Sequence, residues 1–142
     1  MVIYFCGSIA GSREFADIYG EMVCYLQALG HTVPTEHIIA PNVWELERQF
    51  SAQQIYERDM AWLRAADAVI AEISAPSLGV GYEIGAALAA GKRVLALYAA
   101  GRRVSCMITG NPDPRLTVSS YTCSREWRHL IDLFVQRVAE EA

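Results

Sequence analysis

The chain has 142 residues, of which 53% are hydrophobic and 20% are charged, and it carries a formal net charge of −4 at pH 7. This length and composition fit one folded domain with its own core, and they exclude an intrinsically disordered chain. The acidic balance argues against a nucleic-acid polymer as a partner, although it is compatible with a local phosphate pocket. Lysines and arginines interrupt the apolar runs before they reach membrane-spanning length, so we expect no membrane segment.

The cysteines and histidines show no spacing typical of a metal site or of a disulfide framework. None of the four cysteines belongs to a CxxC pair, and the three histidines form no ligand motif with them. Reduced thiols in a reducing compartment are the simpler interpretation. Residues 2–6 are too few for the apolar region of a signal peptide, and they follow no basic segment, so we expect a cytoplasmic protein.

The first part of the chain predicts a strand, a loop, a helix and a second strand. Residues 1–6 are apolar throughout, as in a strand buried on both faces, and residues 7–12 form a loop rich in small side chains. From Arg13, apolar residues recur at three- and four-residue intervals until Gly30, which suits the position just after a helix. Residues 31–34 are predicted to form a short second strand, which a proline ends.

Residues 35–50 are the least regular part of the sequence. We interpret them as a lid or wall over the mouth of a site, with some helix within residues 43–49. Ser51 suits the N-cap of the next helix, which is predicted to run to about Ala66. Asp59 lies on the apolar stripe of this helix, together with Ile55, Trp62 and Ala66. A carboxylate in such a stripe needs a partner or a chemical task, and a salt bridge near a helix end is the simpler alternative.

A loop with one proline and two glycines then links a strand to a helix. Residues 68–73 are typical of a buried strand, residues 74–81 form the loop, and the helix is predicted to run to Ala90. A helix N-terminus presents free N–H groups and a partial positive charge, which suits a phosphate. Glu83 is predicted in the first turn, where the dipole favours the ionised carboxylate that a nucleophile or a base requires. The simpler alternative is that Glu83 only complements the helix dipole.

The rest of the chain completes an α/β pattern. Residues 94–98 and 116–119 are two further strands, residues 99–114 form a loop with a short helix near 104–108, and an amphipathic helix follows from Ser124. Five strands alternating with helices predict a flavodoxin- or Rossmann-like, doubly wound parallel sheet in the order 2-1-3-4-5. Ligands of such folds lie at the carboxyl ends of the strands, so we expect the first loop and the glycine-containing loop to face one crevice.

Five short motifs occur together, and in order, along the chain. They are Tyr4-Phe-Cys-Gly-Ser-Ile9, Thr35-Glu-His37, Glu57-Arg-Asp-Met-Ala-Trp-Leu63, Pro76-Ser-Leu-Gly-Val-Gly-Tyr-Glu83 and Ser105-Cys-Met-Ile-Thr-Gly110. With these motifs the chain closely resembles the 2′-deoxynucleoside 5′-phosphate N-hydrolases, which belong to the nucleoside 2-deoxyribosyltransferase family. The resemblance covers nearly the whole chain and implies a single domain of this type over residues 1–142.

The resemblance implies a hydrolase that cleaves the N-glycosidic bond of a 2′-deoxynucleoside 5′-monophosphate, with no cofactor and no metal. Glu83 matches the nucleophile that forms a covalent glycosyl–enzyme ester, and Asp59 matches the second carboxylate of the family. Tyr4 matches a tyrosine whose hydroxyl hydrogen-bonds the nucleophile and sets its pKa. An ordinary strand aromatic is the simpler interpretation of Tyr4.

The resemblance also implies how the nucleotide is held. The phosphate is expected at two loops, which contribute Gly7, Ser8, Ile9, Ala10, Gly11, Ser77 and Gly79. His37 and Met107 are expected near the base. A loop hydrogen bond is an equally simple explanation for His37, and interface packing is one for Met107. Ser105 matches a serine that a neighbouring subunit contributes, which implies a homodimer. Relatives often carry a basic residue at the position of Ala10, so phosphate affinity or substrate preference is expected to differ here.

Four other functions compete with this interpretation. A nucleoside 2-deoxyribosyltransferase would use the same glutamate but would pass the sugar to another base instead of to water. A ribonucleotide N-glycosidase, acting for example on CMP, would differ in the sugar, and a cytokinin-activating phosphoribohydrolase would carry a PGGxGT loop that residues 76–81 match poorly. A non-catalytic nucleotide-binding module gains weight only if the two carboxylates lie apart.

Overall fold

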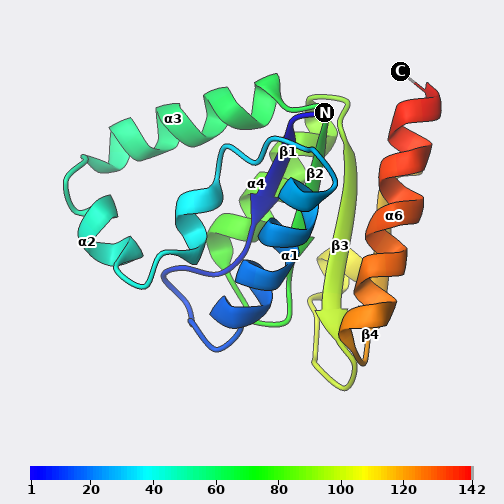
Figure 1. Ribbon diagram of the computed structural model, residues 1–142. Coiled ribbons are helices and arrows are strands. Elements are labelled where there is room, and N and C mark those ends of the chain that lie inside the picture. The colour runs from blue at the N-terminus through cyan, green and yellow to red at the C-terminus, as the bar shows by residue number, and fades with distance from the viewer. Residues whose placement is uncertain (142) are drawn as a thin grey trace.

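The computed structural model of this protein describes residues 1–141 and shows an all-parallel, four-stranded sheet in the order β1-β2-β3-β4. The strands are β1 (Ile3–Cys6), β2 (Ala68–Glu72), β3 (Arg93–Ala99) and β4 (Leu116–Tyr121). The helices are α1 (Ala16–Ala28), η1 (Glu36–Ile39), α2 (Val43–Glu47), α3 (Ala52–Ala65), α4 (Leu78–Ala89), α5 (Cys106–Thr109) and α6 (Ser124–Glu141). Figure 1 shows the helices on both sides of the sheet, so the predicted α/β class is confirmed.

Alternation along the strands divides the core into two layers. Ile3 and Phe5 of β1 pack with residues of α1 and α6 on one face of the sheet. Tyr4 and Cys6, which point to the opposite face, pack with residues of α3 and α4. Both faces are covered, which explains why the first three strands are apolar almost throughout. The alternation also directs the Tyr4 side chain toward α4.

The segment predicted as a second strand forms no strand, and the described part of the chain has no fifth strand. Thr32 makes one isolated parallel bridge with Val2. The ladder cannot continue, because Pro34 has no N–H to donate. The hydroxyl of Thr35 replaces the missing backbone partner: it accepts from the N–H of Phe5 at 3.1 Å and donates to its carbonyl at 2.6 Å. The predicted order 2-1-3-4-5 is therefore wrong in its edge strand, whereas the order of the other four strands is confirmed.

Serine hydroxyls fix where two helices near the site begin. Ser51 accepts from the N–H of Gln54 at 3.1 Å, and the Gln54 side chain accepts from the N–H of Ser51 at 2.8 Å, which is a complete capping box for α3. Ser77 caps α4 by accepting a main-chain N–H at 3.3 Å. Because α4 begins directly after this cap, Glu83 lies in its second turn and not in the predicted first turn.

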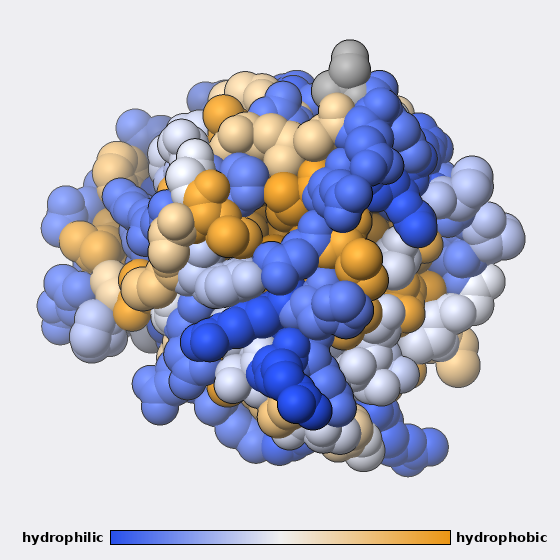
Figure 2. Space-filling model, turned by 45° about the vertical axis from the view of Figure 1, so that its right-hand side comes forward, coloured by the Kyte–Doolittle hydropathy of each residue, from blue (hydrophilic) through white to orange (hydrophobic). Residues whose placement is uncertain are grey.

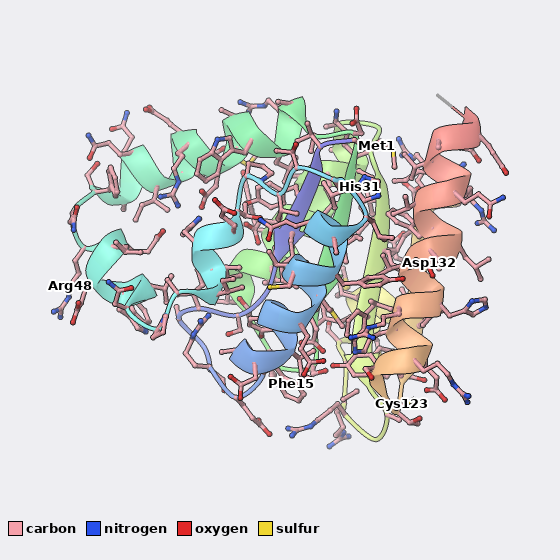
Figure 3. All side chains as sticks on the ribbon, viewed as in Figure 1. Met1, Phe15, His31, Arg48, Cys123 and Asp132 are labelled. Carbon is pink, nitrogen blue, oxygen red and sulfur yellow. The ribbon has the colours of Figure 1, made fainter. Side chains whose placement is uncertain are left out.

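The opposite face of the sheet is closed by α1 and α6, which pack side by side (Figure 3). The hydroxyl of Tyr25 on α1 donates to Asp132 on α6 at 2.7 Å, and the Tyr25 ring lies edge-on to Trp127. Figure 2 shows one side of the molecule, where polar side chains cover most of the surface and apolar side chains gather near its middle. Within the described residues, none of the helices has both the length and the apolar character needed to cross a membrane.

Candidate active site

A cavity of about 270 Å³ lies where β1 ends, between the sheet and α3. Its floor and walls come from four segments far apart in the sequence: β1 with the loop after it, η1 with α2, α3, and the start of α4. The lining residues that carry polar or reactive groups are Tyr4, Cys6, Thr35, His37, Glu47, Asp59, Ser77 and Glu83. The position agrees with the general rule that ligands of parallel α/β sheets bind at the carboxyl ends of the strands.

Tyr4 and Glu83 meet in this cavity although 79 positions separate them in the sequence. The Tyr4 hydroxyl donates a hydrogen bond of 2.5 Å to Glu83 Oε1. Burial raises the pKa of the Tyr4 phenol, and the charge of Glu83 raises it further, so the phenol stays protonated and remains a donor. The predicted contact between these two side chains is present.

The environment of Glu83 raises its pKa from 4.5 to about 7. Burial is the main cause, and the charge of Asp59 adds to it, whereas hydrogen bonds from Tyr4 and from the Cys6 thiol oppose the rise. The helix dipole, which acts mainly within the first turn, does not produce the ionised state predicted for Glu83, because this residue lies in the second turn. Glu83 therefore titrates near neutral pH, as a catalytic carboxylate often does.

Asp59 projects from α3 into the same cavity. Its Oδ1 accepts from Arg58 Nε at 2.8 Å, so the salt bridge that was the simpler alternative exists. It does not replace the other interpretation, because Asp59 also lines the cavity and its charge acts on Glu83. The two carboxylates face one space, which argues against the non-catalytic module that required them to lie apart.

The two loops predicted to hold the phosphate lie in direct contact. A Cβ atom on Gly11 would come within 2.6 Å of the Pro76 carbonyl oxygen, so only glycine fits there. Gly7, Ile9 and Ala10 line the cavity from one loop, and so do Ser77 and Gly79 from the start of α4.

Ser8 behaves differently from its neighbours in the first loop. Its side chain is fully buried and accepts from the N–H of Ser12 at 2.9 Å, while its own N–H donates to the Tyr19 hydroxyl at 3.1 Å. The hydroxyl and the N–H of Ser8 therefore hold the loop together, and Ser8 does not line the cavity, unlike Gly7, Ile9 and Ala10.

Residues 35–50 form a wall of the cavity, as the sequence analysis predicted. His37 from η1 and Trp44 and Glu47 from α2 all line it. His37 Nε2 lies 3.2 Å from Glu47 Oε1. Burial lowers the pKa of His37, and the nearby positive charge of Arg58 lowers it further, so the imidazole is mostly neutral at pH 7.

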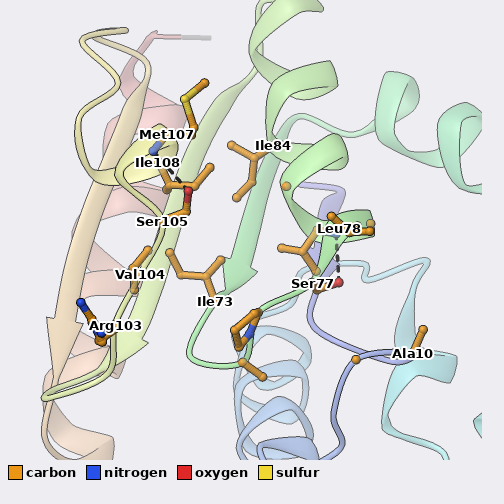
Figure 4. A pocket seen from close by; sticks show the side chains of 16 residues that line it. Ala10, Ile73, Ser77, Leu78, Ile84, Arg103, Val104, Ser105, Met107 and Ile108 are labelled. Carbon is orange, nitrogen blue, oxygen red and sulfur yellow. Dashed lines mark hydrogen bonds between the residues drawn. The ribbon is translucent and has the colours of Figure 1, made fainter.

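A second and larger cavity, of about 780 Å³, adjoins the first (Figure 4). It lies between the start of α4 and the segment around α5, and it contains the predicted residues Ser105 and Met107. Ser105 caps α5, and the Met107 side chain is 81% exposed. Neither residue lines the first cavity, but Ala10, Ser77 and Gly79 line both.

Sequence reasoning assigned no role to three residues that lie near the Asp59 and Glu83 carboxylates: Cys6, Glu47 and Arg58. Cys6 was visible only as a buried strand cysteine, and the order of the chain does not show that Glu47 folds back toward α3. Arg58 directly precedes Asp59, which was the one available signal. Within residues 1–141, no group of three or more His, Cys, Asp or Glu side chains is arranged to hold a metal ion.

The model of the nucleoside 2-deoxyribosyltransferase family matches residues 3–122. The chain belongs to this family. This result confirms the resemblance that the five motifs indicated. Relatives of the chain in this family include proteins named as nucleotide N-hydrolases, so the predicted enzyme class, N-glycosidase, is confirmed as well.

Two curated relatives and one solved structure illustrate the similarity. The 5-hydroxymethyl-dUMP N-hydrolase of Mus musculus is 45% identical over 115 residues, which are 78% of this chain and 66% of the mouse protein. A Methanosarcina mazei protein named "Putative 2'-deoxynucleoside 5'-phosphate N-hydrolase 1" is 37% identical over 134 residues, 94% of this chain and 83% of that protein. A CMP N-glycosidase from Clostridium botulinum shares the fold, with a TM-score of 0.72 and 20% identity over 94% of this chain and 99% of its own.

Proposed function

We propose that this family member hydrolyses the N-glycosidic bond of 2′-deoxynucleoside 5′-monophosphates, giving a free base and 2-deoxyribose 5-phosphate. The observation that carries the proposal is the meeting of Tyr4, Asp59 and Glu83 in one cavity, with the Tyr4 hydroxyl 2.5 Å from Glu83. Two carboxylates beside one cavity are the arrangement that glycosidases use. The names of the mouse and Methanosarcina relatives support a deoxynucleotide substrate.

In the first step, a carboxylate oxygen of Glu83 attacks C1′ of the sugar. A C–O bond forms, the C1′–N bond breaks, and its electron pair leaves with the base, which takes up a proton from solvent or through Asp59. The transition state resembles an oxocarbenium ion, so the negative carboxylates beside C1′ stabilise the positive charge that develops there. Tyr4 fixes one oxygen of Glu83 and leaves the other for the attack.

In the second step, water attacks C1′ and the ester bond to Glu83 breaks. The water oxygen stays on the sugar, one proton is released through Asp59 or to solvent, and Glu83 leaves as a carboxylate. The pKa of about 7 suits both steps, because the group is largely ionised for attack just above neutral pH and is still an adequate leaving group.

We propose that the phosphate lies against the loop with Gly7, Ile9 and Ala10 and the N-terminus of α4 at Ser77 and Gly79. There the main-chain N–H groups and the helix dipole favour an anion. The base then extends toward His37, on the wall formed by η1 and α2.

We propose further that the protein is a homodimer in which each subunit contributes Ser105 to its neighbour's site. The exposed Met107 beside Ser105, and Leu78 at 97% exposure on the other side of the second cavity, support an interface there. Light scattering after size-exclusion chromatography gives the mass in solution. Mixing a Glu83→Ala subunit with a Ser105→Ala subunit then tests the exchange, because hybrid dimers would regain one intact site.

The decisive experiment incubates the protein with a panel of nucleoside monophosphates, deoxy and ribo, and separates the products by chromatography. We expect free base and 2-deoxyribose 5-phosphate from deoxynucleotides, and no release by Glu83→Ala. A second free base added to the reaction distinguishes hydrolysis from transfer, since a transferase would form a new nucleotide. Absence of cleavage by the wild type, or equal cleavage by Glu83→Ala, would contradict the proposal.

A further inference from the structure

The guanidinium group of Arg58 lies between two carboxylates that belong to different parts of the site. Arg58 Nε donates to Asp59 Oδ1 at 2.8 Å, and Arg58 Nη2 donates to Glu47 Oε1 at 2.8 Å. We propose that Arg58 is a positioning residue that fixes the Asp59 carboxylate and, through Glu47, fastens the wall formed by η1 and α2 over the cavity. The role of Asp59 in this inference rests on the function proposed above.

The contact between Arg58 and Asp59 does not follow from their adjacency in the chain. Neighbouring residues on a helix point in different directions, so the Arg58 side chain has to bend back to reach Asp59. Both Nε and Nη2 lie 2.8 Å from the same oxygen, Oδ1. Oδ2 accepts no hydrogen bond from any residue within 1–141, so one oxygen is anchored while the other is free to meet a substrate.

Aromatic rings hold the arginine in this bent conformation. The guanidinium carbon lies 4.9 Å from the ring centre of Trp62, one turn further along α3, and 5.8 Å from that of Phe50. Such cation–π contacts favour arginine because its planar group stacks while its edges still donate hydrogen bonds. The side chain is only 22% exposed, so its ion pairs are better shielded than those of a typical surface pair.

His37 connects the same network to the base side of the cavity. Its Nε2 lies 3.3 Å from Arg58 Nη2 and 3.2 Å from Glu47 Oε1, and its ring packs 5.8 Å from that of Trp62. The charged groups near His37 are therefore Arg58, which lowers its pKa, and Glu47 and Asp59, which raise it. The protonation of His37 reports on this network without any need for catalysis.

The consequence is that the wall and the catalytic carboxylate are not independent. If α2 moves away from α3, Arg58 loses Glu47, and the anchor on Asp59 loosens with it. Small displacements of a catalytic group reduce turnover strongly while leaving ground-state binding nearly intact. We therefore expect loss of Arg58 to affect kcat much more than KM.

The kinetic test compares Arg58→Gln and Arg58→Lys with Arg64→Gln. Arg64 lies on the same helix, is exposed, and makes no ion pair within the described residues, which makes it the matched control. We expect kcat to fall about 10- to 100-fold in Arg58→Gln with KM changed less than about threefold. Lysine restores only part of the loss, because one nitrogen cannot serve both carboxylates as the arginine fork does. Arg64→Gln should match the wild type.

The second test follows the His37 ring by NMR as the pH changes, in the wild type and two variants. Loss of the positive charge in Arg58→Gln should raise the midpoint of the His37 titration, and Glu47→Gln should lower it. A midpoint that does not move in Arg58→Gln, or a kcat within about twofold of the wild type, would overturn the inference. If the wild type cleaves no nucleotide, the proposed function fails, whereas the His37 titration still tests the network.

Discussion

Two glutamates, the fully buried Glu72 and the half-buried Glu83, lie near the same end of the sheet and have different surroundings. Burial raises the pKa of both above the ordinary value for a carboxyl group. Glu72 ends β2 and is fully buried, and it accepts from the N–H and the hydroxyl of Ser74 and from the Tyr121 hydroxyl. Glu83 has the Tyr4 hydroxyl as its strong donor, faces a cavity and has a second carboxylate nearby.

The comparison teaches that a raised pKa does not by itself identify a catalytic group. The hydrogen bonds to Glu72 come from groups of the fold itself, and Glu72 lines neither cavity, so its carboxylate ties β2 to the loop at Ser74 and to β4. Glu83 retains an oxygen without a strong partner and has access to a ligand. The predictions below separate a structural carboxylate from a catalytic one.

The largest effect is expected for Glu83→Gln, which keeps the shape of the side chain but removes the nucleophile. We expect kcat to fall by about 10⁴-fold or more, because removal of a nucleophile in other enzymes has effects of this size. Steady-state rates with a deoxynucleoside monophosphate measure the change, and circular dichroism checks that the fold is kept. Activity within tenfold of the wild type would show that Glu83, like Glu72, has a structural and not a catalytic role.

The same substitution should change how stability depends on pH. The pKa of Glu83 is about 7 in the folded protein and about 4.5 in an unfolded chain, so the folded state binds more protons between these values. Stability from this group therefore falls as the pH rises from 4.5 to 7, by up to about 3 kcal/mol, and stays low above pH 7. Urea unfolding at pH 5 and pH 8 should show that Glu83→Gln flattens this dependence and stabilises the protein most at pH 8.

Glu72→Ala should destabilise the protein, whereas Glu83→Gln should stabilise it. Loss of the carboxylate leaves the hydroxyls of Ser74 and Tyr121 without their acceptor and opens a cavity, so we expect the free energy of unfolding to fall by about 2–3 kcal/mol. Glu21→Ala, at an exposed position of α1, is the control and should change stability by less than about 0.5 kcal/mol. A Glu72→Ala protein as stable as the control would contradict the structural role.

Tyr4→Phe should reduce the rate about 10- to 100-fold at pH 7, since it removes a hydrogen bond to a charged group. That hydrogen bond lowers the pKa of Glu83, so its loss raises this pKa. The rise of kcat/KM with pH, centred near pH 7 in the wild type, should therefore move to higher pH in Tyr4→Phe. An unchanged profile would show that the phenol does not act on the nucleophile.

Tyr121→Phe is expected to have the smallest effect. It removes one of the hydrogen bonds to Glu72, at 2.9 Å, and leaves the ring in place. We expect a loss of about 1 kcal/mol in the free energy of unfolding and no more than about a twofold change in kcat/KM. A larger loss of activity in Tyr121→Phe than in Tyr4→Phe would contradict the assignment of Glu72 as structural and Glu83 as catalytic.

Much of the fold could be predicted because local signals agree with the final structure. Apolar runs marked the strands, Gly30 and Ser51 marked helix ends, and the alternation of elements led to the parallel sheet. The failure at the predicted second strand arose from hydrogen bonding that periodicity does not reveal. Pro34 stops the strand ladder, and the hydroxyl of Thr35 makes the hydrogen bonds to Phe5 that a strand backbone would otherwise make.

The parts of the candidate site that belong to the sequence motifs could be predicted. Contacts that depend on how distant helices pack together could not. The contact between Tyr4 and Glu83 followed from the resemblance, because both residues belong to its motifs, and their catalytic roles stay predictions. The raised pKa of Glu83 was missed for two reasons. The helix start was predicted one turn too late, which put Glu83 in the first turn, and the sequence does not show how strongly this carboxyl group is buried. The bond from Arg58 to Glu47 depends on how α2 packs on α3, which no local pattern contains.

The interrupted pairing beside β1 has a consequence for the behaviour of the protein in concentrated solution. β1 is one of the two edge strands of the sheet, and an open edge is where strands of other molecules add and start aggregates. Here the N–H of Ile3 already donates to the Thr32 carbonyl, the N–H and carbonyl of Phe5 are bonded to the Thr35 hydroxyl, and Pro34 has no N–H to offer an added strand. The segment that fails to become a strand thus hinders copies of the sheet from joining at the β1 edge.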